Sequence, residues 1–150
     1  MKIIKDKQII EDTLTHVADN EEISSKNITV SLSRWKSEKA KLTEHQGTIG
    51  VRVSPADNIE DIADDLTLIS LIAVELPAFT DGRAFSHTRL LRDRYNYQGE
   101  IRAIGSYMPD QVFYLTRVGV NAFEFDKADD LNVALSTMND FSVSYQASTN

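Results

Sequence analysis

The chain has 150 residues, a length that suits one domain with its own hydrophobic core. Hydrophobic residues make up 41% and charged residues 26%, the balance of a soluble globular protein. No cysteine is present, which excludes disulfides, thiolate metal ligation and a cysteine nucleophile supplied by this chain. The net charge of −7 argues against nucleic-acid binding, because affinity for a phosphate backbone comes from clustered positive charge.

The N-terminal residues MKIIKDKQIIED carry charges where a signal peptide needs an apolar block. The longest apolar run, residues 68–76, is far too short to cross a membrane. We therefore expect a soluble cytoplasmic protein that does not associate with a membrane.

The N-terminal part, residues 1–30, is predicted to form a small hairpin followed by a loop. Two short apolar runs, residues 2–4 and 8–10, flank a charged turn, although no glycine fixes the turn type. Residues 18–27 are polar and indicate a loop before a short strand at 28–30. Ser31 or Ser33 is placed to cap a helix that extends to about Glu44.

From residue 48 onward the pattern predicts four strand-helix units in succession. The strands are expected at 48–53, 68–76, 100–105 and 121–125, and the following helices run from about 55 to 66, 82 to 95, 109 to 118 and 126 to 137. Short connections between such units predict right-handed crossovers and a mostly parallel sheet in a single α/β domain spanning residues 1–150. Residues 141–150 are expected to form a frayed tail.

Four units are too few to close an eight-stranded barrel. The sheet is therefore expected to be either an open three-layer sandwich or a half-barrel. The sandwich is favoured for a monomer, since a half-barrel needs a partner or the N-terminal elements to cover its edges.

Arginine is concentrated in one segment. Residues 79–125 hold six of the eight arginines and no lysine. Between residues 81 and 117 these six face four carboxylates, a local charge of +2 that leaves −9 on the rest of the chain. Guanidinium groups in this setting either hold a small anion or a partner's carboxylates, or form intrahelical pairs and cover apolar surface.

Polar side chains follow the predicted strands at their C-terminal ends, the edge where parallel α/β sheets build sites. The candidate anion-binding or partner-binding residues are Glu75, Asp81, Gly82, Arg83, His87, Arg102, Asp110, Gln111 and Glu124. Arg83 and His87 lie one helical turn apart, close enough to bind the same oxyanion at a helix N-terminus. Glu75 ends an apolar strand, so it is either a site residue or the ion-pair partner of an arginine such as Arg83 or Arg102.

Recognisable catalytic and cofactor motifs are missing. The chain has no GxxxxGK[ST], GxGxxG, GxSxG or HExxH sequence and no cluster of His, Asp and Glu at metal-ligand spacing. The catalytic residues and any cofactor are therefore unknown, no metal site is predicted, and the sequence does not decide whether the protein is an enzyme.

The segment FTDGRAFSHTRLLRDRYNYQGEIRAIGSYMPDQVFYLTRVGVNAFEF, residues 79–125, resembles the bacterial domain-of-unknown-function 934 family. The pattern FxDGRxxSxxRLLRxRxxYxGExRAxG is followed by DQ, Arg117, Gly119 and AFE, and weaker similarity brings the total to about two-thirds of the chain. Ser106, Pro109 and Val118 depart from the residues that members commonly carry there, so these positions cannot supply a required ion pair or thiol.

Members of this family are often labelled "probable oxidoreductase involved in sulfite reduction" because they accompany assimilatory sulfite reductase. The resemblance implies a connection with sulfur assimilation. Our leading hypothesis is an accessory or anion-binding protein that docks onto sulfite reductase or holds a small oxyanion such as sulfite. The alternatives are an oxidoreductase of the same pathway whose cofactor binds without a known motif, and a homodimeric interaction module.

Overall fold

The chain is an α/β protein, and its described residues form one curled, mixed sheet of eight strands. The computed structural model describes residues 1–76 and 82–149. The strands are β1 (Lys2–Lys5), β2 (Gln8–Glu11), β3 (Thr15–His16), β4 (Ile28–Ser31), β5 (Ile49–Val53), β6 (Leu71–Leu76), β7 (Glu100–Gly105) and β8 (Ala122–Phe123). Their spatial order is β2-β1-β8-β7-β6-β5-β4-β3. Strands β3 to β8 are parallel, and β1 is antiparallel to both of its neighbours, β2 and β8.

The helices follow the strands in alternation. They are α1 (Leu32–Leu42), the 3₁₀ helix η1 (Ile59–Leu68), α2 (Arg83–Arg89) continued by the π-helical turn η2 (Leu90–Arg94), the short η3 (Pro109–Gln111) leading into α3 (Val112–Val118), and α4 (Ala128–Thr149). None of the described helices is long and apolar enough to span a membrane.

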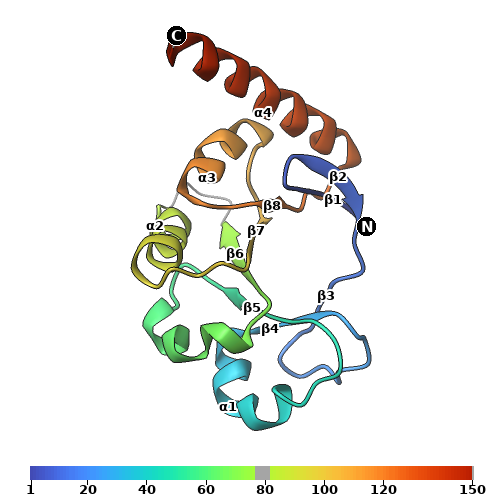
Figure 1. Ribbon diagram of the computed structural model, residues 1–150. Helices are drawn as coiled ribbons and strands as arrows, with labels where there is room; N and C mark the ends of the chain where they lie inside the picture. Colours follow the sequence, from blue (N-terminus) through green and yellow to red (C-terminus); the bar gives the residue numbers. More distant parts are fainter. Residues whose placement is uncertain (77–81, 150) are drawn as a thin grey trace.

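The strand order decides between the two predicted architectures. Neighbouring parallel strands follow one another along the chain, so every right-handed crossover places its helix on the same face of the sheet. The helices form an arc around the outside of the strands (Figure 1), as in one half of an α/β barrel. The half-barrel is therefore observed, and the open sandwich, which needs helices on both faces, is wrong.

The N-terminal residues cover both edges of the half-barrel. The predicted hairpin is confirmed, and its turn places Asp6 and Lys7 at φ of 50° and 66°, a conformation that tight hairpin turns need and that glycine usually supplies. The hairpin extends the sheet beyond β8, whereas β3, a strand that the sequence did not predict, extends it beyond β4. Residues 12–17, which we call the crossing segment, connect these two edges past the open side of the sheet.

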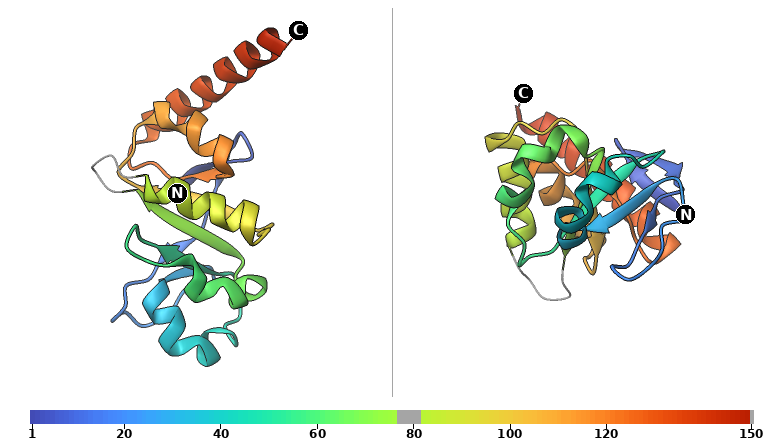
Figure 2. Two further views of the ribbon diagram at one scale, coloured as in Figure 1. Left: turned by 90° about the vertical axis from the view of Figure 1, so that its left-hand side faces the viewer. Right: turned by 90° about the horizontal axis from the view of Figure 1, so that it is seen from below.

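The apolar core lies between the outer face of the sheet and the helices. It includes alternate strand residues such as Val51, Ile72 and Ile101, and the fully buried Trp35 of α1, whose indole N–H donates to Asp65 at 3.0 Å. The last helix, α4, continues past residue 137, where the sequence predicted its end. It extends away from the body of the protein (Figure 2).

Arg92 ties the end of η2 to the two turns beside it. Its guanidinium donates to the carbonyl oxygens of Tyr97 and Gly99 at 2.7 and 2.8 Å, and to that of Gly119 through Nε and Nη2 at 3.0 and 2.8 Å. Gly119, at φ 120°, ends α3 as the sequence predicted. One planar side chain thus satisfies three backbone acceptors from two different loops.

We predict that Arg92→Lys destabilises the fold by about 2 kcal/mol, because an ammonium cannot reach three carbonyls in this planar arrangement. Urea denaturation measures the loss. Arg94→Lys is the matched control: Arg94 is an exposed residue of the same turn, 5.7 Å from the Tyr95 ring, and its replacement should cost less than about 0.5 kcal/mol. Equal losses in the two variants would contradict the role given to Arg92.

Candidate functional site

The C-terminal ends of the parallel strands form one rim, and most of the predicted site residues lie on or near it. Glu75 is the penultimate residue of β6, Gly82 and Arg83 open α2, and Asp110 and Gln111 follow the neighbouring strand β7. Asp81 lies outside the described residues. The topology therefore brings the described part of the DGR turn and the DQ turn to a common rim.

Arg83 and His87 bind backbone carbonyls of the loop after β5. Arg83 Nη1 lies 3.5 Å from the carbonyl oxygen of Pro55, and the buried His87 donates from Nε2 to that of Ser54 at 3.2 Å. This second contact fixes the proton of His87 on Nε2, since a carbonyl oxygen only accepts. Arg83 and His87 thus contact adjacent backbone groups of the protein itself, whereas the predicted shared oxyanion stays a prediction.

The DQ turn has a structural role at its second residue. Gln111 accepts the backbone N–H of Met108 on its Oε1 at 3.1 Å, which caps the start of η3. Asp110 is exposed at the rim, and Gly82 has open space around its Cα. Glu75 faces Arg52 of the neighbouring strand, with 3.9 Å between Oε1 and Nε, rather than the predicted Arg83 or Arg102.

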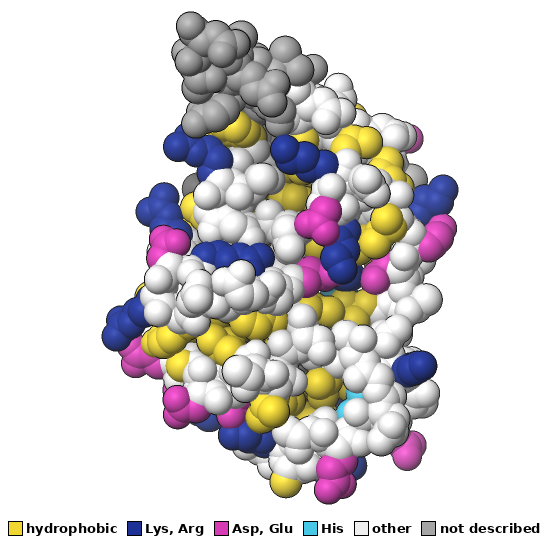
Figure 3. All heavy atoms as spheres, in the orientation of Figure 1, with side chains coloured by type: hydrophobic (Ala, Val, Ile, Leu, Met, Phe, Trp, Pro, Cys, Tyr) yellow, Lys and Arg dark blue, Asp and Glu magenta, His cyan; other side chains and the backbone are white. Residues whose placement is uncertain are grey.

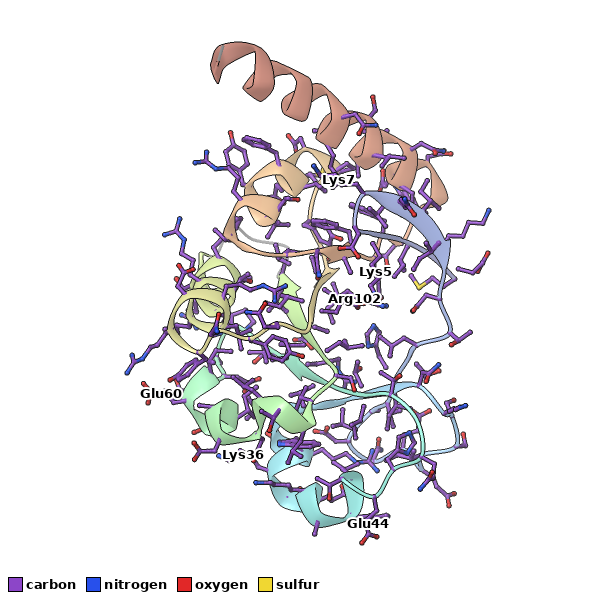
Figure 4. All side chains as sticks on the ribbon, viewed as in Figure 1. Lys5, Lys7, Lys36, Glu44, Glu60 and Arg102 are labelled. Atoms are coloured by element: carbon purple, nitrogen blue, oxygen red, sulfur yellow. The ribbon has the colours of Figure 1, made fainter. Side chains whose placement is uncertain are left out.

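Arg102 lies inside the curl of the sheet rather than at its rim. It is 2% exposed and binds three carboxylates at 2.8 Å: Asp12 of the crossing segment, Glu100 of its own strand, and Glu124 after β8. Figure 4 shows its position in the interior, with Lys5 to one side; Lys5 also binds Glu100 at 3.1 Å. The surrounding carboxylates raise the pKa of Arg102 against the opposing effect of burial.

Glu124 connects this cluster to a chain of hydrogen bonds across the inner face. It accepts from His16 Nε2 at 3.0 Å, and His16 Nδ1 lies 2.6 Å from the hydroxyl of the buried Thr29. Arg52 Nη1 donates to the same hydroxyl at 2.9 Å. Because arginine only donates, the Thr29 hydroxyl accepts from Arg52, and this hydroxyl therefore links Arg52 to His16.

Three residues of this interior were not predicted as site residues: Arg52, Asp12 and His16. Arg52 could have been predicted from the sequence. Strand alternation places it on the face opposite the buried Val51 and Val53, where an arginine needs partners. Asp12 and His16 could not have been predicted, because their role depends on the path of the crossing segment.

A hollow lies on the helical face, where α3 faces α2 and η2. It has a volume of about 560 Å³ and is lined by Phe85, Arg89, Asp93, Tyr114, Arg117 and Val118. We call it the arginine groove. Figure 3 shows Lys and Arg side chains gathered over this part of the surface, at the left of the view. Arg89 and Arg117 are exposed, and Arg117 lies 5.8 Å from the Phe113 ring.

We predict that Arg102→Met destabilises the fold by roughly 3 to 5 kcal/mol at neutral pH, because three carboxylates are left without their shared cation. Burial alone would raise the pKa of Asp12 and of Glu124. Their hydrogen bonds and neighbouring charges have the larger, opposite effect, so both pKa values lie below the ordinary values of 3.8 and 4.5. In the native protein this stabilisation is present above those values and is lost as the pH falls below about 4.5.

In Arg102→Met the carboxylates of Asp12 and Glu124 lose this cation, so we expect them to take up protons more readily and the variant to lose less stability as the pH falls from 7 to 5. The difference in free energy of unfolding between the native protein and Arg102→Met should therefore narrow over this range, as followed by urea denaturation. Arg117→Met, at an exposed position, should show little loss and no such narrowing. A difference that stays constant with pH would contradict the ion cluster.

Comparison with known families gives one assignment. The family described as "Bacterial protein of unknown function (DUF934)" matches residues 50–150, which include Arg52, Arg102, Glu124 and the arginine groove. Asp12 and His16 precede the matched region. A search of curated proteins gave no match. Because the match covers more than half of the chain, the protein belongs to this bacterial family of unknown function.

Proposed function

We propose that this chain is a cytoplasmic accessory protein of assimilatory sulfite reduction that docks onto an acidic surface of sulfite reductase through the arginine groove. The link to sulfite reduction is supported by the resemblance of residues 79–125 to proteins that accompany that enzyme. The proposed docking mode rests on one observation: Arg89 and Arg117 line the same groove, in a protein whose net charge is −7.

The lining of the groove suits a protein partner. Tyr114 is 57% exposed and Phe85 lies beside it in the same groove, so aromatic surface is available together with two guanidinium groups. Tyrosine and arginine are enriched among residues that contribute most to protein–protein binding. Guanidinium binds carboxylates through two parallel hydrogen bonds, which favours an acidic surface on the partner.

Three of the other arginines of the segment are committed within the protein, and the fourth, Arg94, lies 5.7 Å from the Tyr95 ring and is not part of the groove lining, which is why we assign docking to this pair. Arg102 binds three carboxylates, Arg92 binds three carbonyls, and Arg83 reaches the carbonyl of Pro55. An oxyanion that binds Arg102 would have to displace carboxylates whose combined negative charge already exceeds the single positive charge of the guanidinium. We therefore favour partner docking over binding of a free oxyanion at the inner face.

We predict that Arg89→Glu/Arg117→Glu weakens binding to sulfite reductase of the same bacterium by at least about tenfold, because two attractive contacts become repulsive. Surface plasmon resonance with the immobilised reductase measures the change. Binding of the native protein should also weaken as salt rises from about 50 to 300 mM, since exposed charge pairs are screened.

The matched control is Lys2→Glu/Lys41→Glu, which changes the net charge equally at two exposed positions outside the groove. It should bind within about twofold of the native protein. Equal weakening in the two double variants would mean that net charge, not the groove, matters. No binding by the native protein would reject the docking proposal, whatever the variants do.

A further inference from the structure

The rim of the parallel strands carries a groove that is separate from the arginine groove. It consists of two adjoining hollows, of about 360 and 280 Å³, that share Glu75 as a wall. We call the whole the rim groove. It extends from the ends of β4 and β5, past the end of β6, to the end of β7. This is the edge at which parallel α/β sheets bind small molecules.

The larger hollow is polar and has an excess of negative charge. Its walls include Asp19, Ser31, Arg52, Ser54, Asp57 and Glu75. Three carboxylates thus face one guanidinium. Arg52 directs Nη1 and Nη2 away to the carbonyl oxygens of Thr29 and Val17, at 2.9 and 2.7 Å. The charge that a ligand meets in this hollow is therefore mainly that of the carboxylates.

The polar walls are held in place before any ligand arrives. The Ser31 hydroxyl donates to Asp19 at 2.5 Å while it caps α1 through the backbone N–H of Arg34. Asp57 accepts the backbone N–H of Ser54 at 2.8 Å, and His87 holds the carbonyl of the same residue. The Glu75 side chain is 39% exposed, which leaves carboxylate surface for a ligand. Preorganised groups lose little entropy on binding.

The smaller hollow is mainly apolar. Besides Glu75 it is lined by Pro55, Leu76, Ile104, Gly105 and Ser106. Gly105 adopts a φ of 101°, and a Cβ there would lie 2.4 Å from the carbonyl oxygen of Leu76, so a side chain is excluded from this wall. The groove therefore offers anionic groups at one end and aliphatic surface at the other, with Glu75 between them.

From this arrangement we propose that the rim groove binds a small molecule with a cationic amine head and a short apolar tail. The ammonium group lies against Glu75 and Asp57, and the tail covers Leu76 and Ile104. Burial of the tail adds about 25 cal/mol per Å² of apolar surface to the charge-assisted hydrogen bonds of the head. A small oxyanion is repelled by the same carboxylates and has no use for the apolar end.

The test compares three probes that share a tail and differ in charge: n-pentylamine, 1-pentanol and pentanoate, added to the ¹⁵N-labelled protein and followed by two-dimensional NMR. Pentylammonium should shift the amide signals of Ser31, Ser54 and Ser106, which line the groove, and bind with a dissociation constant on the order of 1 mM. Pentanol should bind at least about fivefold more weakly. Pentanoate and sulfite should leave these signals unchanged at 20 mM, a concentration about 20 times the expected dissociation constant.

Glu75→Gln removes the shared carboxylate at a partly exposed position, and it should weaken pentylammonium binding by about tenfold while the NMR spectrum stays that of a folded protein. Glu60→Gln, on η1 and exposed outside the groove, is the control and should leave binding unchanged. Shifts with pentanoate or sulfite instead of the amine would overturn the proposal, as would the absence of rim shifts with pentylammonium at 20 mM. Neither result bears on docking through the arginine groove.

Discussion

The buried guanidinium of Arg102 is the constraint around which this half-barrel is organised. A closed α/β barrel fills its interior with side chains from opposite strands, but a half-barrel has no opposite strands. Here Arg102 projects into that space at 2% exposure, and its charge is compensated by carboxylates from the crossing segment, from its own strand and from the end of β8. A buried ion without partners is costly, so the cluster fixes the crossing segment in one place. Leu14, between Asp12 and His16, then packs on the apolar patch of Leu71, Ala73 and Ile104.

The same constraint connects the interior to the rim. Glu124 is shared between Arg102 and His16, and His16 reaches Arg52 through the hydroxyl of Thr29. Tyr107 donates to the carbonyl oxygen of Glu124 at 2.6 Å and packs on Phe125, which holds the backbone beneath the shared carboxylate. Each member of this chain contacts the next, so the inner face is a single polar network and not a set of separate ion pairs.

The sequence predicted the repeating part of this fold well, because the signal there is local. Residues 100–105 form the strand predicted between Gly99 and the turn before Pro109, and Gly119 ends a helix where its positive φ is needed. The choice of half-barrel over sandwich was not accessible, since it depends on strand order. The path of residues 12–17 was not accessible either: Asp12 and His16 look like ordinary loop residues until Arg102 is placed between the strands. Glu75 was expected to be either a site residue or the partner of an arginine such as Arg83 or Arg102. The arginine that it faces is Arg52, a strand residue whose alternation was the available clue.

Counting arginines along the sequence suggested an anion site, yet the structure separates them by what each one faces. Helix α2 makes this division concrete. Arg83 and His87 lie on the side that contacts the loop after β5, whereas Phe85 and Arg89, two residues further along, are rotated by about 200° and line the arginine groove. One short helix therefore forms part of a cation-rich hollow and also supports the wall of an anionic one. The sign of charge that each hollow accepts follows from these contacts, because a guanidinium that already binds carboxylates or carbonyls contributes little attraction to a further anion. Local pairing, and not the regional sum of +2, decides which arginines remain available for a partner.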